Sequence, residues 1–169
     1  MAAVGAQPDT ELADLDLGDG YVMRAATLRP AITDEVVFRE VHAHDPAHEA
    51  VIALAQERWE DAAREVSRLL AADPDSARYR TLWAHVLRDT GRLDEAEALL
   101  TDLIADSTDG PRRTLQGHLA KVHFAAGRYA EAADLFEQVL DERRRAGAGP
   151  DTLATSALGL ARAREELRR

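Results

Sequence analysis

The stretch ARYRTLWAHVLRDTGRLDEAEALLTDLIADSTDG, residues 77–110, predicts two helices joined by a tight turn. Trp83, Ala84 and Leu87 lie on one side of the first helix. The second helix has an apolar stripe at spacings of three and four residues, formed by Leu93, Ala96, Leu99, Leu100 and Leu103. Gly91 suits the turn because glycine adopts the left-handed backbone that ends a helix at no steric cost.

The start of the second helix recurs along the chain. GRLDEA at residues 91–96 is matched by ERWEDA at 57–62, 34 residues earlier, and by GRYAEA at 127–132, 36 residues later. In each copy an alanine follows a bulky residue by three positions: Trp59 and Ala62, Leu93 and Ala96, Tyr129 and Ala132. The small side chain lets two helices approach closely, and the bulky one fills the gap beside it. This pattern predicts stacked helix pairs.

The recurring unit resembles the tetratricopeptide repeat, a helix–turn–helix with a period of about 34 residues. The resemblance covers residues 43–169, and its matching positions are Ala50, Trp59, Ala62 and Pro74 in the first repeat, Trp83, Ala84, Gly91 and Ala96 in the second, and Leu119, Ala120, Gly127, Tyr129, Ala132 and Phe136 in the third. Glu57 departs from the usual glycine, and no proline closes the second or third repeat. The resemblance implies an all-α fold, a right-handed α-solenoid of antiparallel helix pairs.

We expect a repeat domain over residues 45–169. Its three repeats are placed at about 43–76, 77–110 and 113–146, and the first of them is predicted to contain helices at 47–56 and 59–72, with Asp45 as cap and Pro46 at the first helical position. Leu158 and Gly159 repeat the large-small pair of the first helices. They predict a lone helix at 151–168 that caps the array with a polar outer face.

The N-terminal part is expected to be different. Residues 1–20 contain five acids and no base, which predicts an acidic, disordered tail. This tail either solubilises the protein or docks on a surface through Leu12, Leu15 and Leu17. Residues 21–44 form an extension in which Thr33 is predicted to cap a short helix packed on the first repeat, although Val36-Val37-Phe38 also favours a strand.

Composition narrows the class of protein. The net charge of −10 disfavours nucleic-acid binding, and no apolar stretch predicts membrane insertion. A secretory signal would show a basic segment followed by an apolar run. The N-terminal sequence shows no such pattern, so we expect a cytoplasmic protein. Lys121 is the only lysine beside many arginines and alanines, which is typical of a GC-rich bacterial genome.

The sequence carries no clear catalytic or metal-binding pattern. The glycines fall singly at turns, no nucleophile motif occurs and cysteine is absent, so we expect neither an enzyme nor a bound cofactor. His42, His44 and His48 could hold a divalent ion, but a helix boundary at Asp45 breaks their common face, and we expect no metal. The run at 143–145 is interpreted as cations complementing a helix C-terminus rather than a phosphate or nucleic-acid patch.

The resemblance implies that the first helix of each repeat lines a concave groove that binds peptides. The groove residues predicted from the helical pattern are His48, Val51, Arg78, Thr81, His85, Arg88, Thr114, His118, Lys121 and Ser156. Acids are scarce among them, which predicts a protein or peptide partner that is acidic or carboxylate-ended. The chain's own N-terminal tail is a second expected occupant.

Two functions are compatible with these features. The first is a protein–protein interaction scaffold or adaptor that binds a partner segment in the concave groove. The alternative is a self-associating assembly or regulatory subunit that acts through its terminal helix. Some members of the family clamp the C-terminal carboxylates of heat-shock chaperones with Lys, Arg and Asn. This sequence contains no asparagine and offers Ala47, Val51, Leu82 and His118 instead, which argues against clamping in that form.

Overall fold

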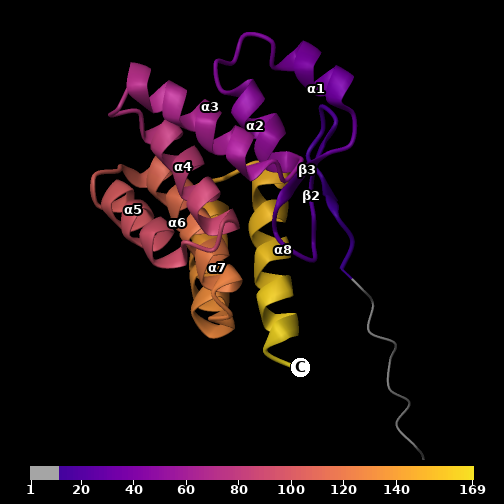
Figure 1. Ribbon diagram of the computed structural model, residues 1–169. Helices are drawn as coiled ribbons and strands as arrows, with labels where there is room; N and C mark the ends of the chain where they lie inside the picture. The colour runs from indigo at the N-terminus through magenta and orange to yellow at the C-terminus, as the bar shows by residue number, and fades with distance from the viewer. Residues whose placement is uncertain (1–11) are drawn as a thin grey trace, which may run out of the picture.

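The computed structural model describes residues 12–169, and within that range eight helices follow three short strands (Figure 1). The helices are α1 (Glu35–Val41), α2 (His48–Ala55), α3 (Trp59–Ala72), α4 (Ala77–Asp89), α5 (Leu93–Ala105), α6 (Asp109–Ala125), α7 (Tyr129–Arg145) and α8 (Pro150–Glu166). From α2 to α8 each helix packs on the next one. The predicted all-α class is therefore confirmed, with a small sheet added to it.

The turns between paired helices share one backbone conformation. Gly91 and Gly127 have φ of 81° and 73°, and Glu57 takes the same left-handed conformation at φ 58°. The sequence departs from glycine at Glu57, but the fold keeps the turn. A non-glycine residue adopts this conformation only at a steric cost, which the packing of the first helix pair must offset.

The repeated small residues are completely buried between helices. Ala62, Ala96 and Ala132 are each 0% exposed and belong to three successive buried clusters. Trp59 and Leu93 pack against the clusters of the first and second pairs. The large-small packing inferred from the spacing is thus present in the first two pairs, and in the third pair the alanine is buried as expected.

Two helix starts differ from the expected positions. Asp45 is not the cap of α2, as had been expected: the N-cap is Ala47, without a side-chain cap bond, and the helix begins at His48. Asp45 Oδ1 accepts from the Ala47 amide at 2.9 Å in the turn before the helix. Helix α6 begins at Asp109 and includes Pro111, although the third repeat was expected to begin at residue 113. Proline is tolerated there because the amides of a first turn have no helical acceptor.

Residues 12–34 form an antiparallel sheet in the order β1 (Leu15–Asp16), β2 (Tyr21–Met23) and β3 (Pro30–Ile32). This differs from the disordered tail expected for residues 12–20; residues 1–11 of that tail lie outside the described range. The β1–β2 turn is built by three successive left-handed residues, Gly18, Asp19 and Gly20, at φ 80°, 54° and 73°. Asp14 Oδ1 also accepts from the Ala25 amide at 2.7 Å.

The helix expected near Thr33 is present as α1, with Asp34 rather than Thr33 as its cap: Asp34 Oδ1 accepts from the Val37 amide at 3.1 Å. Phe38 is the one buried residue of α1, and its ring lies 5.7 Å from that of Tyr21. Polar contacts join α1 to the first repeat, because Glu35 accepts from the Gln56 side-chain amide at 2.6 Å.

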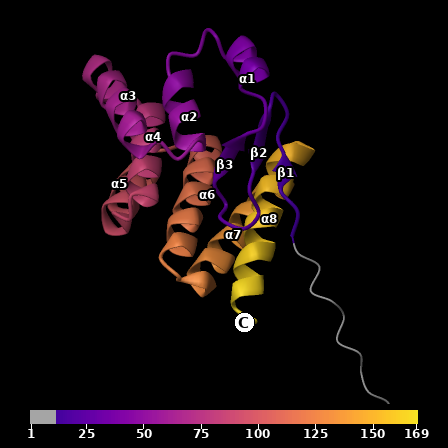
Figure 2. The same ribbon diagram turned by 45° about the vertical axis from the view of Figure 1, so that its right-hand side comes forward.

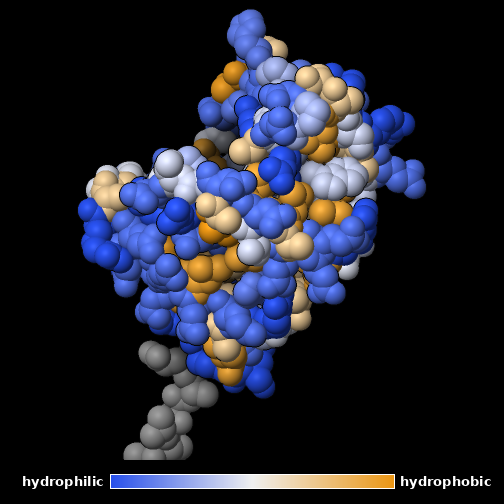
Figure 3. Space-filling model, turned by 90° about the vertical axis from the view of Figure 1, so that its left-hand side faces the viewer, coloured by the Kyte–Doolittle hydropathy of each residue, from blue (hydrophilic) through white to orange (hydrophobic). Residues whose placement is uncertain are grey.

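The sheet lies across the array rather than beside it. Strand β3 contacts α2, and β1 contacts α8 at the other end. Figure 2 shows the strands between α6 and α8, with α2 above β3. The face that carries α5 is mainly hydrophilic, with hydrophobic residues in smaller areas between (Figure 3). In residues 12–169 no helix combines the length and the apolar character needed to cross a membrane.

Candidate functional site

The first helices of the repeats form one continuous face. Helix α2 contacts α4, α4 contacts α6, and α6 contacts α8. The ten predicted groove residues all lie on these helices: His48 and Val51 on α2, Arg78, Thr81, His85 and Arg88 on α4, Thr114, His118 and Lys121 on α6, and Ser156 on α8. We call this face the groove, and we call residues 12–34, which lie over it, the N-terminal segment.

Leu28 anchors the N-terminal segment. It is 1% exposed and shares a buried cluster with Ala120 of α6, Phe136 of α7 and Leu160 of α8. Its backbone has φ 55°, a left-handed conformation that is unfavourable for leucine. Burial of the whole side chain among three helices offsets that strain.

Arg29 follows the anchor and reaches the second repeat. Its Nε donates to Asp89 Oδ1 at 3.0 Å, and its guanidinium lies 5.4 Å from the centre of the Trp59 ring. The Asp89 side chain is 2% exposed, and it also accepts two hydrogen bonds from Arg88, at 2.7 and 2.8 Å. Arg88 was expected to face a partner in the groove, but its guanidinium forms both of these hydrogen bonds with the neighbouring Asp89.

His85 and His118 face each other across α4 and α6. Their Nε2 and Nδ1 atoms lie 3.0 Å apart, so one ring donates to the other. Burial lowers the pKa of both imidazoles well below 6.5, and the nearby positive charge of Lys121 lowers them further. His85 was expected to help attract an acidic partner, but at neutral pH this pair carries no charge.

Lys121 lies beside the same pair. Its Nζ is 3.7 Å from Met23 Sδ of β2. Burial, together with the smaller effects of the positive charges of Arg88 and Arg143, lowers the pKa of Lys121 to about 7. The N-terminal segment therefore covers the middle of the groove, where the side chains of Arg88, His85 and Lys121 had been expected to face a partner.

The α2 end of the groove is more acidic than expected. Arg78 is paired with Asp45, and His48 contacts Asp45 and Glu49: Nδ1 donates to the Asp45 carbonyl oxygen at 2.7 Å and Nε2 lies 3.1 Å from Glu49. Val51 and Arg78 line a cavity of about 270 Å³ under Tyr21 and Phe38. The Thr81 hydroxyl is bonded to the carbonyl oxygen of its own helix at Ala77.

The α6–α8 end gathers the other predicted residues. Thr114, His118, Lys121 and Ser156 line a second cavity, of about 200 Å³, which we call the basic cavity. Met23, Gly117, Phe136, Arg143 and Thr155 complete its wall. The groove predicted as one surface is thus divided by the N-terminal segment into two cavities.

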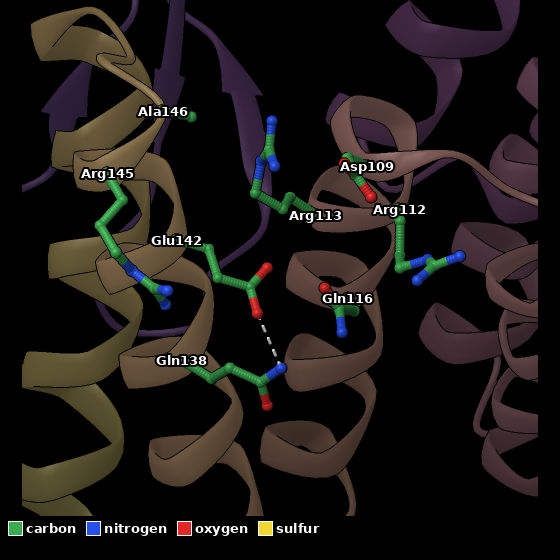
Figure 4. A pocket seen from close by; sticks show the side chains of 8 residues that line it. All are labelled: Asp109, Arg112, Arg113, Gln116, Gln138, Glu142, Arg145 and Ala146. Carbon is green, nitrogen blue, oxygen red and sulfur yellow. Dashed lines mark hydrogen bonds between the residues drawn. The ribbon is translucent and has the colours of Figure 1, made fainter.

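A third cavity, of about 490 Å³, lies between α6 and α7 and was not predicted (Figure 4). Arg112, Arg113 and Arg145 surround it, together with the acids Asp109 and Glu142. Figure 4 shows Glu142 pointing into the space between the helices, where it accepts a hydrogen bond of 3.0 Å from the Gln138 amide. The arginines of this third cavity thus have carboxylates beside them. In residues 12–169 no group of three or more His, Asp or Glu is placed to hold a metal ion.

Comparison with known families agrees with this architecture. A family model described as tetratricopeptide repeat matches residues 49–111, 81–150 and 118–169, which together span α2 to α8. The chain belongs to the tetratricopeptide repeat family. Tetratricopeptide repeats generally mediate protein–protein interaction, so protein partners are the expected ligands of this array. Neither the curated proteins nor the solved structures contain a match to this tetratricopeptide repeat chain.

Proposed function

We propose that this chain is an interaction adaptor whose groove binds an extended segment of a protein partner, and that its own N-terminal segment occupies the groove until the partner displaces it. The observation that supports this proposal most directly is that the N-terminal segment of the same chain lies in the groove. Met23, Leu28 and Ala31 of that segment are 6%, 1% and 4% exposed, so they provide apolar anchors. The groove therefore has the shape and the apolar sites that a partner segment requires.

Displacement of the segment would leave the buried carboxylate of the groove with hydrogen-bond partners. When Arg29 departs, Asp89 keeps both hydrogen bonds from Arg88, so no buried carboxylate loses all its partners. The partner then has to replace mainly apolar contacts, above all those of Leu28. The polar side-chain contacts that the groove would also lose are few: Arg29 with Asp89, Lys121 with Met23, and Arg162 with the Ala26 carbonyl oxygen.

An acidic or carboxylate-ended partner remains our proposal for the α6–α8 end. Lys121 and Arg143 lie there, and in residues 12–169 neither forms an ion pair with a carboxylate. The acids of the N-terminal segment do not fill this role. Asp14 bonds the Ala25 amide and Asp16 bonds the Gly18 amide, so both serve the sheet.

The test uses a fluorescent peptide covering residues 20–33 and the full-length protein. In wild type the tethered segment competes with the peptide at a high effective concentration. A Leu28→Ala, Arg29→Ala variant should bind the peptide saturably, whereas wild type should bind it far more weakly. A peptide carrying Leu28→Asp serves as the matched control. Equal binding by wild type and variant, or binding of the control peptide, would contradict the proposal.

The charge preference is tested separately. Two further peptides carry either two aspartates or two lysines at the end that approaches Lys121. Tighter binding of the aspartate peptide at low salt, lost as salt is raised, is the expected result. The alternative of self-association through α8 is tested by light scattering. Arg162 of α8 already pairs with Glu165 at 2.9 Å and with Glu166 of the same helix, so these charged groups have partners within the chain and are not left for a second copy.

A further inference from the structure

The basic cavity carries an unbalanced charge. Among the nine residues that line it, Lys121 and Arg143 are cations, His118 is a neutral imidazole beside them, and no residue is acidic. The neighbouring cavity between α6 and α7 differs in this respect, because Asp109 and Glu142 line it with the arginines. Two like charges that share a small, partly enclosed space repel each other unless an anion joins them.

Within the part of the chain that the structure describes, Arg143 is held in place from one side. One terminal nitrogen donates to Ser156 Oγ at 2.6 Å and to the Thr152 carbonyl oxygen at 3.2 Å. Burial lowers the pKa of Arg143, and Arg113 lowers it further. A guanidinium has five N–H donors in a planar fork, so most of its donors are left for another acceptor.

Lys121 has a weaker set of contacts still. Its hydrogen-bond acceptor in residues 12–169 is the thioether of Met23, at 3.7 Å. Thioether sulfur accepts hydrogen bonds only weakly. The negative charge that acts on Lys121 is Asp89, which is already bound by Arg88 and Arg29. Among the described residues, 12–169, an ammonium in this position lacks an anion of its own to compensate its burial.

Neutral donors and free space complete the site. Ser156 is 3% exposed, and its hydroxyl accepts from Arg143 and keeps its own hydrogen to donate. Thr114 lies one turn before Gly117 and His118 on the same wall. A Cβ added at Gly117 would meet nothing within 4 Å, so the glycine leaves open space beside α6.

We propose that the basic cavity binds a phosphate group, either as the free ion or as the phosphoryl group of a larger ligand. A phosphate monoester carries a charge of about −1.5 to −2 at pH 7, enough to compensate Arg143 and to favour the protonated form of Lys121, whereas one carboxylate carries a single charge. Its several oxygens accept from Arg143, Lys121 and the Ser156 hydroxyl at once. This inference goes beyond the proposed function, because a free ion in the cavity does not require the N-terminal segment to leave.

The experiment is a calorimetric titration of the full-length protein with inorganic phosphate, O-phosphoserine and acetate at pH 6.5 and matched ionic strength. No peptide is present, so a negative result leaves the adaptor proposal untouched. We expect saturable binding of phosphate with one site per chain and much weaker binding of acetate, because a single carboxylate compensates one basic group only. Tighter binding of O-phosphoserine assigns the natural source to a phosphorylated ligand, and tighter binding of inorganic phosphate assigns it to the free ion.

Variants locate the site. Lys121→Met and Arg143→Met should each weaken phosphate binding about 10-fold or more, since a hydrogen bond to a charged group contributes about 1.5–3 kcal/mol. Arg145→Met is the matched control, because Arg145 lies on the same helix and lines the other cavity. Ser156→Ala gives a milder second variant should Arg143→Met fold poorly. Absence of saturable phosphate binding, equal binding of acetate, or equal losses in Arg143→Met and Arg145→Met would overturn the proposal.

Discussion

Arg29 and Asp89 lie 60 residues apart in the sequence and are joined by a hydrogen bond of 3.0 Å from Nε to Oδ1. This contact connects the loop after β2 to the end of α4. The Asp89 side chain is almost completely buried, whereas the Arg29 side chain is 31% exposed. The bond therefore fixes the N-terminal segment without making the buried carboxylate depend on it, because Arg88 holds the same group from α4.

Arg29→Ala should loosen the segment at modest cost. We expect the free energy of unfolding to fall by about 1 kcal/mol, since the arginine is partly solvated and screened. Hydrogen exchange of residues 21–32 should become faster. Arg24→Ala is the control, since Arg24 is an exposed arginine of the same segment. Equal exchange in both variants would show that the Asp89 contact does not hold the segment.

Leu28→Ala should be far more costly. Removing a buried leucine side chain costs about 2–5 kcal/mol, and here the cavity would open between α6, α7 and α8. Urea unfolding measures the change. Val36→Ala removes an aliphatic side chain that is 68% exposed, so it should change stability by less than about 0.5 kcal/mol. Similar losses in the two variants would mean that Leu28 is not an anchor.

Two glycines in helices should respond in opposite directions to alanine. A Cβ at Gly159 would lie 2.5 Å from Cε1 of the buried Phe136 ring, so Gly159→Ala should cost about 1–3 kcal/mol through overpacking. Gly117→Ala meets open space and should stabilise α6 by about 0.5–1 kcal/mol through helix propensity. Melting temperatures report both, and a stabilised Gly159→Ala variant would contradict the close packing of α7 on α8.

The stability of the protein should rise with pH between 7 and 9. The folded pKa of Lys121 is about 7 and its ordinary value is 10.5, so in this interval the unfolded chain binds more protons than the folded one. Below pH 6.5 the stability should also rise with pH, because the lowered pKa values of His85 and His118 let the unfolded chain bind more protons than the folded one. The charged or titratable groups that act on Lys121 or its imidazole neighbours are Arg88, Asp89, His85, His118 and Arg143.

Urea unfolding at pH 7 and 9 in wild type and Lys121→Met checks this dependence, and the variant should show the flatter profile. Sulfate gives the complementary measurement, because its charge does not change over this range. If the basic cavity binds tetrahedral anions, the stabilisation that sulfate adds should decrease from pH 7 to 9 as Lys121 loses its proton. An unchanged slope in Lys121→Met would show that another group titrates.

The repeat array could be predicted because its signals are local and periodic. Ala62, Ala96 and Ala132 recur at the period of the fold, and their burial follows from it. The pairing of His85 with His118 was also within reach, since the two residues are 33 apart and thus occupy equivalent positions in adjacent repeats. The repeat alignment would have placed them side by side, whereas the helical pattern alone describes each histidine only within its own helix.

The N-terminal segment could not be predicted in the same way. Its strands contain two or three residues each, too few to show an alternating pattern. Leu28 is buried only because helices far along the chain enclose it, and no feature of its neighbours indicates that. Gly18 and Gly20 do predict a turn, and their spacing around Asp19 was the one available signal that an acidic stretch would fold.

The route of the N-terminal segment also bears on how the array melts. In a plain row of repeats each unit touches only its neighbours, so the ends fray first and unfolding spreads inward. Here Arg29 touches the second repeat, Met23 touches the third, and the Ala26 carbonyl oxygen accepts from Arg162 of the last helix at 3.3 Å. The terminal helices thereby share a common neighbour. Because the N-terminal segment links repeats that are not neighbours in the row, the repeats should unfold together in a single cooperative transition.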